Sequence, residues 1–318
     1  PLGAAARVVA GLAALAPRRP AWAGAALVAG ITFAVLTLDA ILGTPLHRGS
    51  TLGPSPTLGG RYYGFGNPTY SVYAVAALVT AAALGWWLRE QGRRVAAVLA
   101  AGAVGVTALL VDLLPGLGAD VGGGLVLLPA AGIVVLAVAG ARVTWTRVLL
   151  IGAVGVVLVA GIGVLDWSRP AEQRTHLGRF VQQVIDGSAL DTVVRKAGYA
   201  AATLTSGPIA WITLAVVVAL VVLVWPGGRR RPAWYRQTVA QWPIITTLLV
   251  GLLVAAVPGS VVNDYGTRIA TVLLAMALPM LGQVVLRTAG TSHHPVPADH
   301  EEGTTGAPPR PGPATSSH

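Results

Sequence analysis

Apolar stretches of about twenty residues recur along most of this chain and are separated by polar connections. An α-helix of that length spans the hydrocarbon core of a bilayer. Only 11% of the residues are charged, whereas soluble domains, whose surface must face water, carry about 25%. The sequence therefore predicts an integral membrane protein.

Length and flanking charge define eight candidate spans. They run approximately over residues 22–43, 68–88, 94–114, 122–141, 147–166, 208–225, 243–262 and 266–287. The predicted fold class is all-α, a polytopic transmembrane helix bundle with an additional amphipathic helix on its outer surface. The bundle occupies residues 22–287, with outer connections at 44–67, 112–121, 166–207 and 263–265.

The two ends of the chain are expected to lie outside this bundle. Residues 1–21 are interpreted as the tail of a preceding span or as an interfacial helix. Residues 288–318 are rich in Pro, Gly, Ser, Thr and His and cannot bury a core, so they are predicted to be a disordered tail.

Charge is distributed unevenly between alternate connections. One set of connections holds 12 basic residues and a single acid, Glu90, whereas the other holds eight basic residues and eight acids. Basic residues are retained on the cytoplasmic side of a membrane, so both termini are predicted to be cytoplasmic in a multi-pass plasma-membrane protein. The net charge of +10 does not indicate nucleic-acid binding, because the basic residues flank apolar segments and do not form one face.

Four polar, glycine-bearing segments all fall on the predicted outer side. They are residues 60–68, 112–124, 166–179 and 263–268. Gly64, Gly66, Gly118, Gly122 and Gly123, in the first two segments, permit tight turns and close approach of a ligand, which favours a binding site. The alternative is structural, because Tyr62, Tyr63, Trp167 and Tyr265 could form an interfacial aromatic belt beside snorkelling arginines.

Residues 177–186 have the apolar spacing of an amphipathic helix on the outer leaflet. Asp186–Gly187 is expected to end it, and Ser188 with Asp191 resembles a capping box that starts a second helix. That second helix is expected to direct Leu190, Val193, Val194 and Ala197 inward.

Three residue types in the outer segments suit a site for a phosphate-bearing anion. Arginine binds phosphate or carboxylate through a planar fork, and a neutral histidine can act as a general base. Aspartate oxygens can hold Mg²⁺ or Ca²⁺, so Asp112, Asp120 and Asp264 are candidate ligands for a divalent cation. The candidate catalytic residues are His176, Asp120 and Asp112, and the candidate substrate-binding residues are Arg61, Tyr62, Tyr63, Asn67, Arg169, Arg174, Arg179, Asp264 and Arg268.

Residues 61–67, 118–123 and 166–180 resemble the membrane-embedded C-terminal half of a group of actinobacterial polytopic membrane proteins. The function of that group is not established. Its members pair a transmembrane domain with an extracytoplasmic domain that resembles the alkaline-phosphatase superfamily. The resemblance covers most of residues 20–290. It implies that this chain is the membrane part of a longer protein and that a phosphatase-like domain is a partner, but it assigns no catalytic residue.

The sequence thus favours a cell-envelope protein with an extracytoplasmic polar pocket that binds and processes a lipid-linked or phosphate-bearing anionic substrate. Membrane lipids and a lipid-linked sugar or phosphate are the expected partners. A transporter or flippase for such a lipid, or a non-catalytic anchor or scaffold for the phosphatase-like domain, are the alternatives. The absence of cysteine excludes disulfides and thiolate chemistry.

Overall fold

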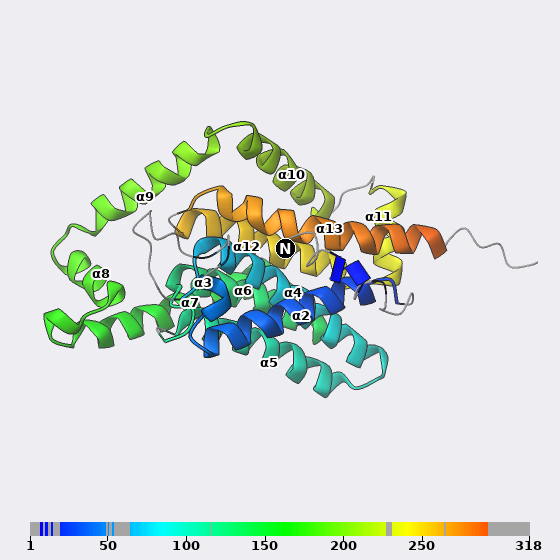
Figure 1. Ribbon diagram of the computed structural model, residues 1–318, viewed down its shortest axis with the longest axis horizontal. Coiled ribbons are helices and arrows are strands. Elements are labelled where there is room, and N and C mark those ends of the chain that lie inside the picture. The colour runs from blue at the N-terminus through cyan, green and yellow to red at the C-terminus, as the bar shows by residue number, and fades with distance from the viewer. Residues whose placement is uncertain are drawn as a thin grey trace, which may run out of the picture.

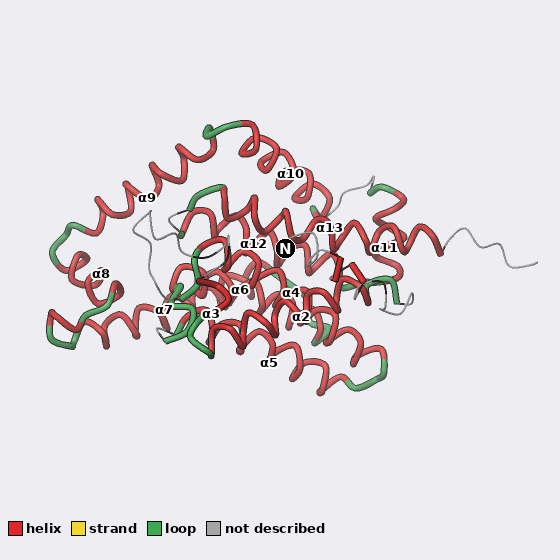
Figure 2. The backbone as a smooth tube through the Cα atoms, viewed as in Figure 1, coloured by secondary structure: helices red, strands yellow, loops and turns green. Residues whose placement is uncertain are grey.

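The computed structural model describes residues 7–8, 10–11, 14, 20–48, 50, 53, 64–114, 116–226, 231–263 and 265–291. Within them the chain forms helices joined by loops and turns, with no strand, as Figure 2 shows. Seven helices are long and apolar enough to cross a membrane, and an eighth crossing is added if the bent pair α9–α10 counts as one span. The predicted fold class, an all-α polytopic helical bundle, is therefore confirmed.

The long helices fall close to the predicted spans. They are α2 (Ala23–Ile41), α4 (Asn67–Glu90), α5 (Arg94–Leu113), α6 (Val121–Val138), α7 (Trp145–Trp167), α10 (Pro208–Val224), α12 (Ile245–Val262) and α13 (Arg268–Thr291). The shorter elements are α3 (Pro45–Arg48), the 3₁₀ turn η2 (Ala171–Gln173), α8 (His176–Ile185), α9 (Ala189–Leu204) and α11 (Ala233–Gln241).

Helix α4 is the centre of the bundle and packs against α2, α5, α6, α12 and α13 (Figure 1). Its buried face is dominated by small residues, including Ala74, Ala77, Ala81 and Ala82. Small side chains let neighbouring backbones approach closely, which is how membrane helices gain packing energy without a hydrophobic driving force between them. The alanine content of this span therefore explains its central place.

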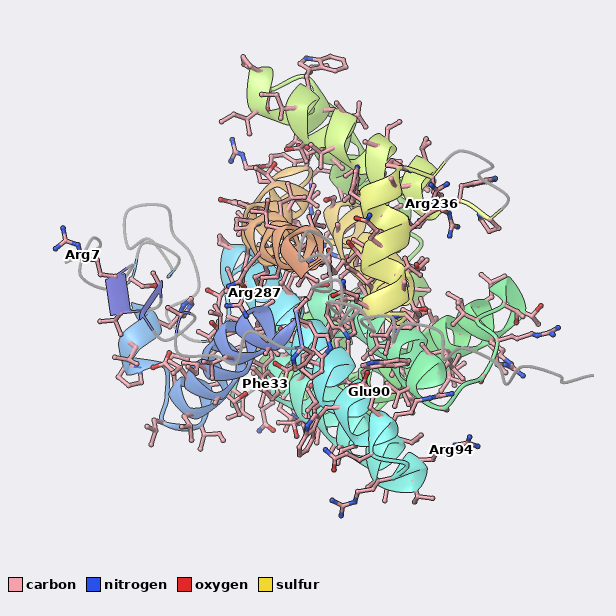
Figure 3. The ribbon with its side chains drawn as sticks, turned by 90° about the vertical axis from the view of Figure 1, so that its right-hand side faces the viewer. Arg7, Phe33, Glu90, Arg94, Arg236 and Arg287 are labelled. Carbon is pink, nitrogen blue, oxygen red and sulfur yellow. The ribbon has the colours of Figure 1, made fainter. Side chains whose placement is uncertain are left out.

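The helix ends form two chemically different layers. At the first, named here the acidic end, α2, α5, α7 and α12 end while α4, α6, α10 and α13 begin, and Asp39, Asp112, Asp120 and Asp166 lie there. The opposite end, named the arginine end, is viewed in Figure 3, where Arg94, Arg236 and Arg287 are labelled with Glu90. The alternation of charge in the sequence thus corresponds to two ends of one bundle.

The connection before α12 is more ordered than its sequence indicates. It contains α11, whose Tyr235 and Thr238 are buried, and Trp242 after it stacks on Trp22 with ring centroids 6.0 Å apart. The Thr238 and Thr288 hydroxyls are 3.2 Å apart, which joins α11 to α13. This segment therefore packs on the arginine end of the bundle.

Helices α7, α8, α9 and α10 form an arch beside the bundle (Figure 1). Helix α7 packs on α6, α8 packs on α7 and α9, and α10 returns to α12 and α13. The axes of α9 and α10 differ by 96° across the break at residues 205–207. The arch thus carries the chain from one flank of the bundle to another across the acidic end.

Candidate functional site

The connections at the acidic end are tied together by backbone hydrogen bonds. Phe65 N donates to Gly118 O at 2.6 Å, which joins the entry of α4 to the α5–α6 turn. Within that turn Asp120 N donates to Asp112 O at 2.8 Å. The sequence prediction that these two polar segments meet on one side of the protein is consistent with this contact.

Asp112 and Asp120 converge on Gly123. Gly123 N donates to Asp120 Oδ1 at 3.0 Å, so Asp120 caps the N-terminus of α6. A Cβ on Gly123 would lie 2.6 Å from Asp112 Oδ2 and 2.5 Å from Tyr70 Cδ2. Only glycine leaves room for the carboxylate and the ring at once.

This aspartate centre is closed to solvent. Asp112 is 0% exposed, Asp120 4% and Tyr70 0%. Asn263, at the C-cap of α12, packs against the neighbouring Gly122, where its Oδ1 would clash with an added Cβ. A substrate has no access to these carboxylates in this conformation, and the cap gives Asp120 a structural role.

A second polar connection at the acidic end involves His47. The Asp39 carboxylate accepts hydrogen bonds from Leu46 N at 2.7 Å and His47 N at 3.0 Å, and so holds the start of α3. His47 Nδ1 lies 3.0 Å from Thr69 Oγ1 on α4. Burial lowers the pKa of His47, and the Asp39 charge and the Gly64 carbonyl offset this only in part. His47 is thus a neutral connector that sequence reasoning missed, because nothing local marks it as buried.

The turn from α7 to α8 is built around Asp166. Its Oδ2 accepts hydrogen bonds from Thr175 N at 2.8 Å, Thr175 Oγ1 at 2.7 Å and Gly178 N at 2.8 Å. Arg169 Nη1 lies 3.6 Å from Asp166 Oδ1, and the arginine side chain is 60% exposed. Asp166 therefore fixes the corner, and the exposed ion pair adds little.

The other arginines of this corner are also engaged by the protein. Arg174 donates to Arg169 O at 3.0 Å and to Gln182 Oε1 at 3.1 Å, and its guanidinium carbon lies 5.5 Å from the Trp167 ring centroid. Arg179 is exposed and its Nε lies 3.4 Å from Thr175 O. These contacts give the Arg174 side chain a role in holding the corner.

The predicted site residues divide into separate groups in the structure. Asp112 and Asp120 lie together on α5 and α6 against α4, whereas α8, which begins at His176, packs on α7 and α9. Asn67 is the first residue of α4, and its carbonyl accepts from Ser71 Oγ at 3.0 Å. Four candidates lie outside the described residues: Arg61, Tyr62, Tyr63 and Asp264. The side chain of His176 is also not described.

No group of three or more metal-binding side chains occurs in the part of the chain that the structure describes. Asp264, one of the three candidate ligands, is not part of it. A site for Mg²⁺ or Ca²⁺ stays a prediction from the sequence.

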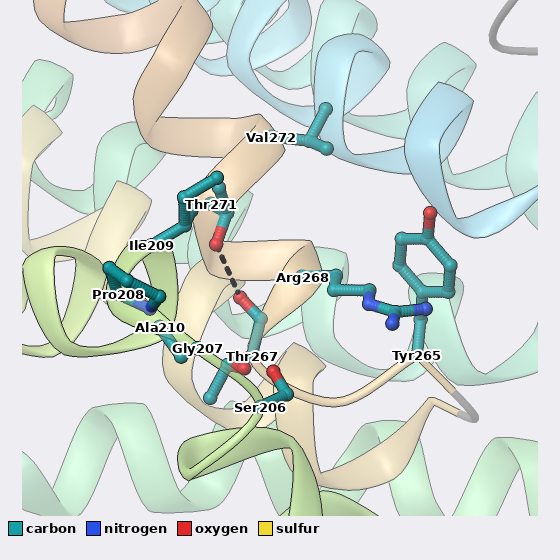
Figure 4. Close-up of a pocket in the computed structure, with 10 residues that line it drawn as sticks. All are labelled: Ser206, Gly207, Pro208, Ile209, Ala210, Tyr265, Thr267, Arg268, Thr271 and Val272. Carbon is teal, nitrogen blue, oxygen red and sulfur yellow. Dashed lines mark hydrogen bonds between the residues drawn. The ribbon is translucent and has the colours of Figure 1, made fainter.

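The remaining candidate, Arg268, lines a crevice of about 380 Å³ between the α9–α10 break and the start of α13 (Figure 4). Its guanidinium carbon lies 5.6 Å from the Tyr265 ring centroid. The crevice is lined by Ser206, Gly207, Pro208, Ile209, Ala210, Tyr265, Thr267, Arg268, Thr271 and Val272.

Hydrogen bonds between α9, α10 and α13 hold the crevice in shape. Thr267 N donates to Thr203 Oγ1 at 3.0 Å, and the Thr213 and Thr271 hydroxyls are 2.8 Å apart. Gly207 has φ +145°, a conformation reserved in practice for glycine, and it turns the chain from α9 into α10. The glycine and the threonines bring the N-termini of α10 and α13 to one opening.

No protein-family model, curated protein or solved structure matches the chain.

Proposed function

We propose that this protein binds a phosphate-bearing anionic lipid, with the headgroup in the crevice beside Arg268. This proposal rests on the fact that the Arg268 guanidinium and the starts of α10 and α13 line one opening. The starts of helices carry a partial positive charge, and arginine adds a bidentate partner for phosphate. All three features favour the same class of ligand.

The Arg268 guanidinium has no ion-pair partner among the described residues. In the described ranges the only ion pair is that of Arg169 with Asp166, so no described carboxylate neutralises the Arg268 guanidinium. The Tyr265 ring supports the guanidinium from one side through a cation–π contact and leaves its N–H groups for an anion.

The crevice opens beside a surface suited to acyl chains. Ile209, Trp211 and Ile212 on α10 are 56–66% exposed, and α10 carries no charged residue. A lipid whose headgroup reached Arg268 would place its chains along this helix. A soluble phosphate would gain the polar contacts only.

Binding is proposed without a reaction because the two candidate aspartates are not among the residues that line the crevice. Asp112 and Asp120 are enclosed against α4, and both act within their own turn. Processing of the bound lipid by His176, Asp112 or Asp120 remains a prediction of the sequence. So does the phosphatase-like partner domain.

A transporter is the second candidate, and the 96° break between α9 and α10 favours it. Broken helices whose half-helix N-termini point at an anionic group are a common device in transporters. The break lies at the edge of the crevice, so a movement of α10 would change the headgroup site directly.

The proposal is tested by ligand-induced thermal stabilisation of delipidated protein in neutral detergent. The probes are dihexanoyl phosphatidic acid, dihexanoyl phosphatidylcholine and inorganic phosphate. We expect stabilisation by the phosphatidic acid that Arg268→Gln weakens about tenfold in apparent affinity, the size of one charge-assisted contact. The matched control, Arg179→Gln, removes an exposed arginine from the same end and should leave the response unchanged.

The arms of this experiment separate the two sources of phosphate. An equal response to inorganic phosphate would show an anion site without lipid specificity. An equal response to phosphatidylcholine, or an unaltered response in Arg268→Gln, would contradict the proposal.

A further inference from the structure

Helix α9 has an unusual distribution of side chains around its axis. The residues that are partly or fully buried form one stripe along the side that meets the protein: Ala189, Thr192, Lys196, Ala200 and Thr203. This stripe is small or polar. The expectation that Leu190, Val193, Val194 and Ala197 face inward is wrong, because all four are exposed.

The exposed apolar residues form a continuous flank of their own. Leu190, Val194, Ala197, Ala201 and Leu204 follow one another at spacings of four and three, and Val193 lies beside them. Such spacing keeps side chains on one side of a helix. Leu190 is 69% exposed and Val194 61%, so this flank has no protein cover in the described residues.

The third flank of α9 is polar. Asp191, Arg195 and Tyr199 follow at spacings of four, and all three are exposed. The helix therefore offers protein contacts on one side, apolar residues on the second and charged residues on the third. In water the exposed apolar flank would be unfavourable, and in hydrocarbon the exposed charged flank would be unfavourable.

The orientation of α9 relative to the spans is consistent with a position at the membrane surface. Because the axes of α9 and α10 differ by 96°, α9 runs along the membrane plane if α10 crosses it. The apolar flank of α9 ends at Leu204, and α10 begins four residues later with Pro208 and the exposed Ile209. The lipid-facing surface of the bundle therefore continues onto α9.

We infer that α9 is an interfacial helix whose Leu190–Leu204 flank is immersed in lipid while its Asp191–Tyr199 flank faces water. Amphipathic helices in the interface lie with the apolar side at the headgroup–acyl boundary. The third side of α9, its small and polar stripe, packs against the rest of the protein. Lipid is the occupant of the apolar flank. This conclusion does not depend on Arg268.

The absence of cysteine from the chain allows a direct test with single-cysteine variants. Val194→Cys and Ala197→Cys report on the apolar flank, and Asp191→Cys and Arg195→Cys report on the polar flank. All four positions are exposed, so a nitroxide label does not disturb packing. The labelled proteins are reconstituted in nanodiscs of phosphatidylglycerol and phosphatidylcholine, and correct folding is checked by gel filtration.

The readout is collisional broadening by oxygen, which concentrates in lipid, and by a neutral nickel chelate, which stays in water. We expect the oxygen-to-nickel accessibility ratio to be several-fold higher at Val194 and Ala197 than at Asp191 and Arg195. High nickel accessibility at all four positions would place α9 in water. High oxygen accessibility at all four would place it inside the hydrocarbon, and shielding of Val194 and Ala197 from both reagents would show a protein partner. Each of these three results would overturn the inference.

Discussion

Thr267 donates two hydrogen bonds to Thr203 at the junction of α9 with the start of α13. Thr267 N donates to Thr203 Oγ1 at 3.0 Å, and the Thr267 hydroxyl donates to Thr203 O at 3.0 Å. Thr203 is 5% exposed, and it also fills the space beside Gly266. This pair is the main polar connection between the arch and the bundle at the crevice.

We expect Thr203→Val to loosen this junction. Valine keeps the shape but removes the acceptor of Thr267 N–H, which costs about 1–2 kcal/mol when the group is shielded from water. The change should be measured as a lower thermal midpoint and faster amide hydrogen exchange in residues 265–271. Thr205→Val is the control, because Thr205 is exposed and its hydroxyl bonds only to Ala202 O in its own turn. Equal effects of the two variants would contradict the role of the pair.

The predictability of the fold differs from that of the site for a physical reason. A span is marked by local apolar length, so helices such as α5 and α12 could be located from the sequence. Which way the apolar side of an amphipathic helix faces is not determined by its local sequence. In a membrane, lipid and the bundle can stabilise the apolar side of α9 equally well. The crevice depends on Thr203 meeting Thr267, a contact between segments 64 residues apart.

The start of α9 shows the same limit on a smaller scale. Ser188 and Asp191 have capping-box spacing, but the Ser188 side chain makes no cap, and its Oγ lies 3.5 Å from Gln183 O. The preceding Gly187 has φ +77° and redirects the chain, so the serine points back to α8. The break at Asp186–Gly187 was correctly predicted, whereas the cap after it was wrong.

Asp120 is expected to act through its cap. Asp120→Ala removes the acceptor of Gly123 N and should lower the free energy of unfolding by about 1 kcal/mol, the usual cost of losing an N-cap. Asp120→Asn keeps an acceptor oxygen and should stay close to wild type in thermal unfolding. Retained stability in Asp120→Ala would show that the cap contributes little.

Gly123 is expected to tolerate no side chain. A Cβ there would stand 2.5 Å from Tyr70 Cδ2 and 2.6 Å from Asp112 Oδ2, so Gly123→Ala should cost about 1–3 kcal/mol through overpacking. Gly102→Ala is the matched control, because a Cβ at that α5 position meets nothing within 4 Å. It should instead stabilise by about 0.5–1 kcal/mol through helix propensity. Thermal unfolding of both variants checks the prediction, which fails if their order is reversed.

Asp166 should matter more than the arginine that pairs with it. Asp166→Ala removes one acceptor from two backbone amides and one hydroxyl, and we expect it to release the α7–α8 corner. Hydrogen exchange at Thr175 and Gly178 should rise at least tenfold, since one lost bond to a charged acceptor is worth about 1.5–3 kcal/mol. Arg169→Gln, which breaks only the exposed ion pair, should leave exchange nearly unchanged. A larger effect in the arginine variant would reverse this ranking.

The side of the membrane that each end faces is predicted by the arginine distribution and can be measured directly. Glu172→Cys at the acidic end and Gln91→Cys at the arginine end are both exposed, and the chain holds no other cysteine. Because basic connections are retained in the cytoplasm, a membrane-impermeant maleimide should label Glu172→Cys in intact cells and Gln91→Cys only after permeabilisation. Labelling of Gln91→Cys alone in intact cells would invert the protein and place the Arg268 crevice at the inner leaflet. The lipids available to that crevice would then be those of the cytoplasmic surface, so this result decides which leaflet supplies the ligand.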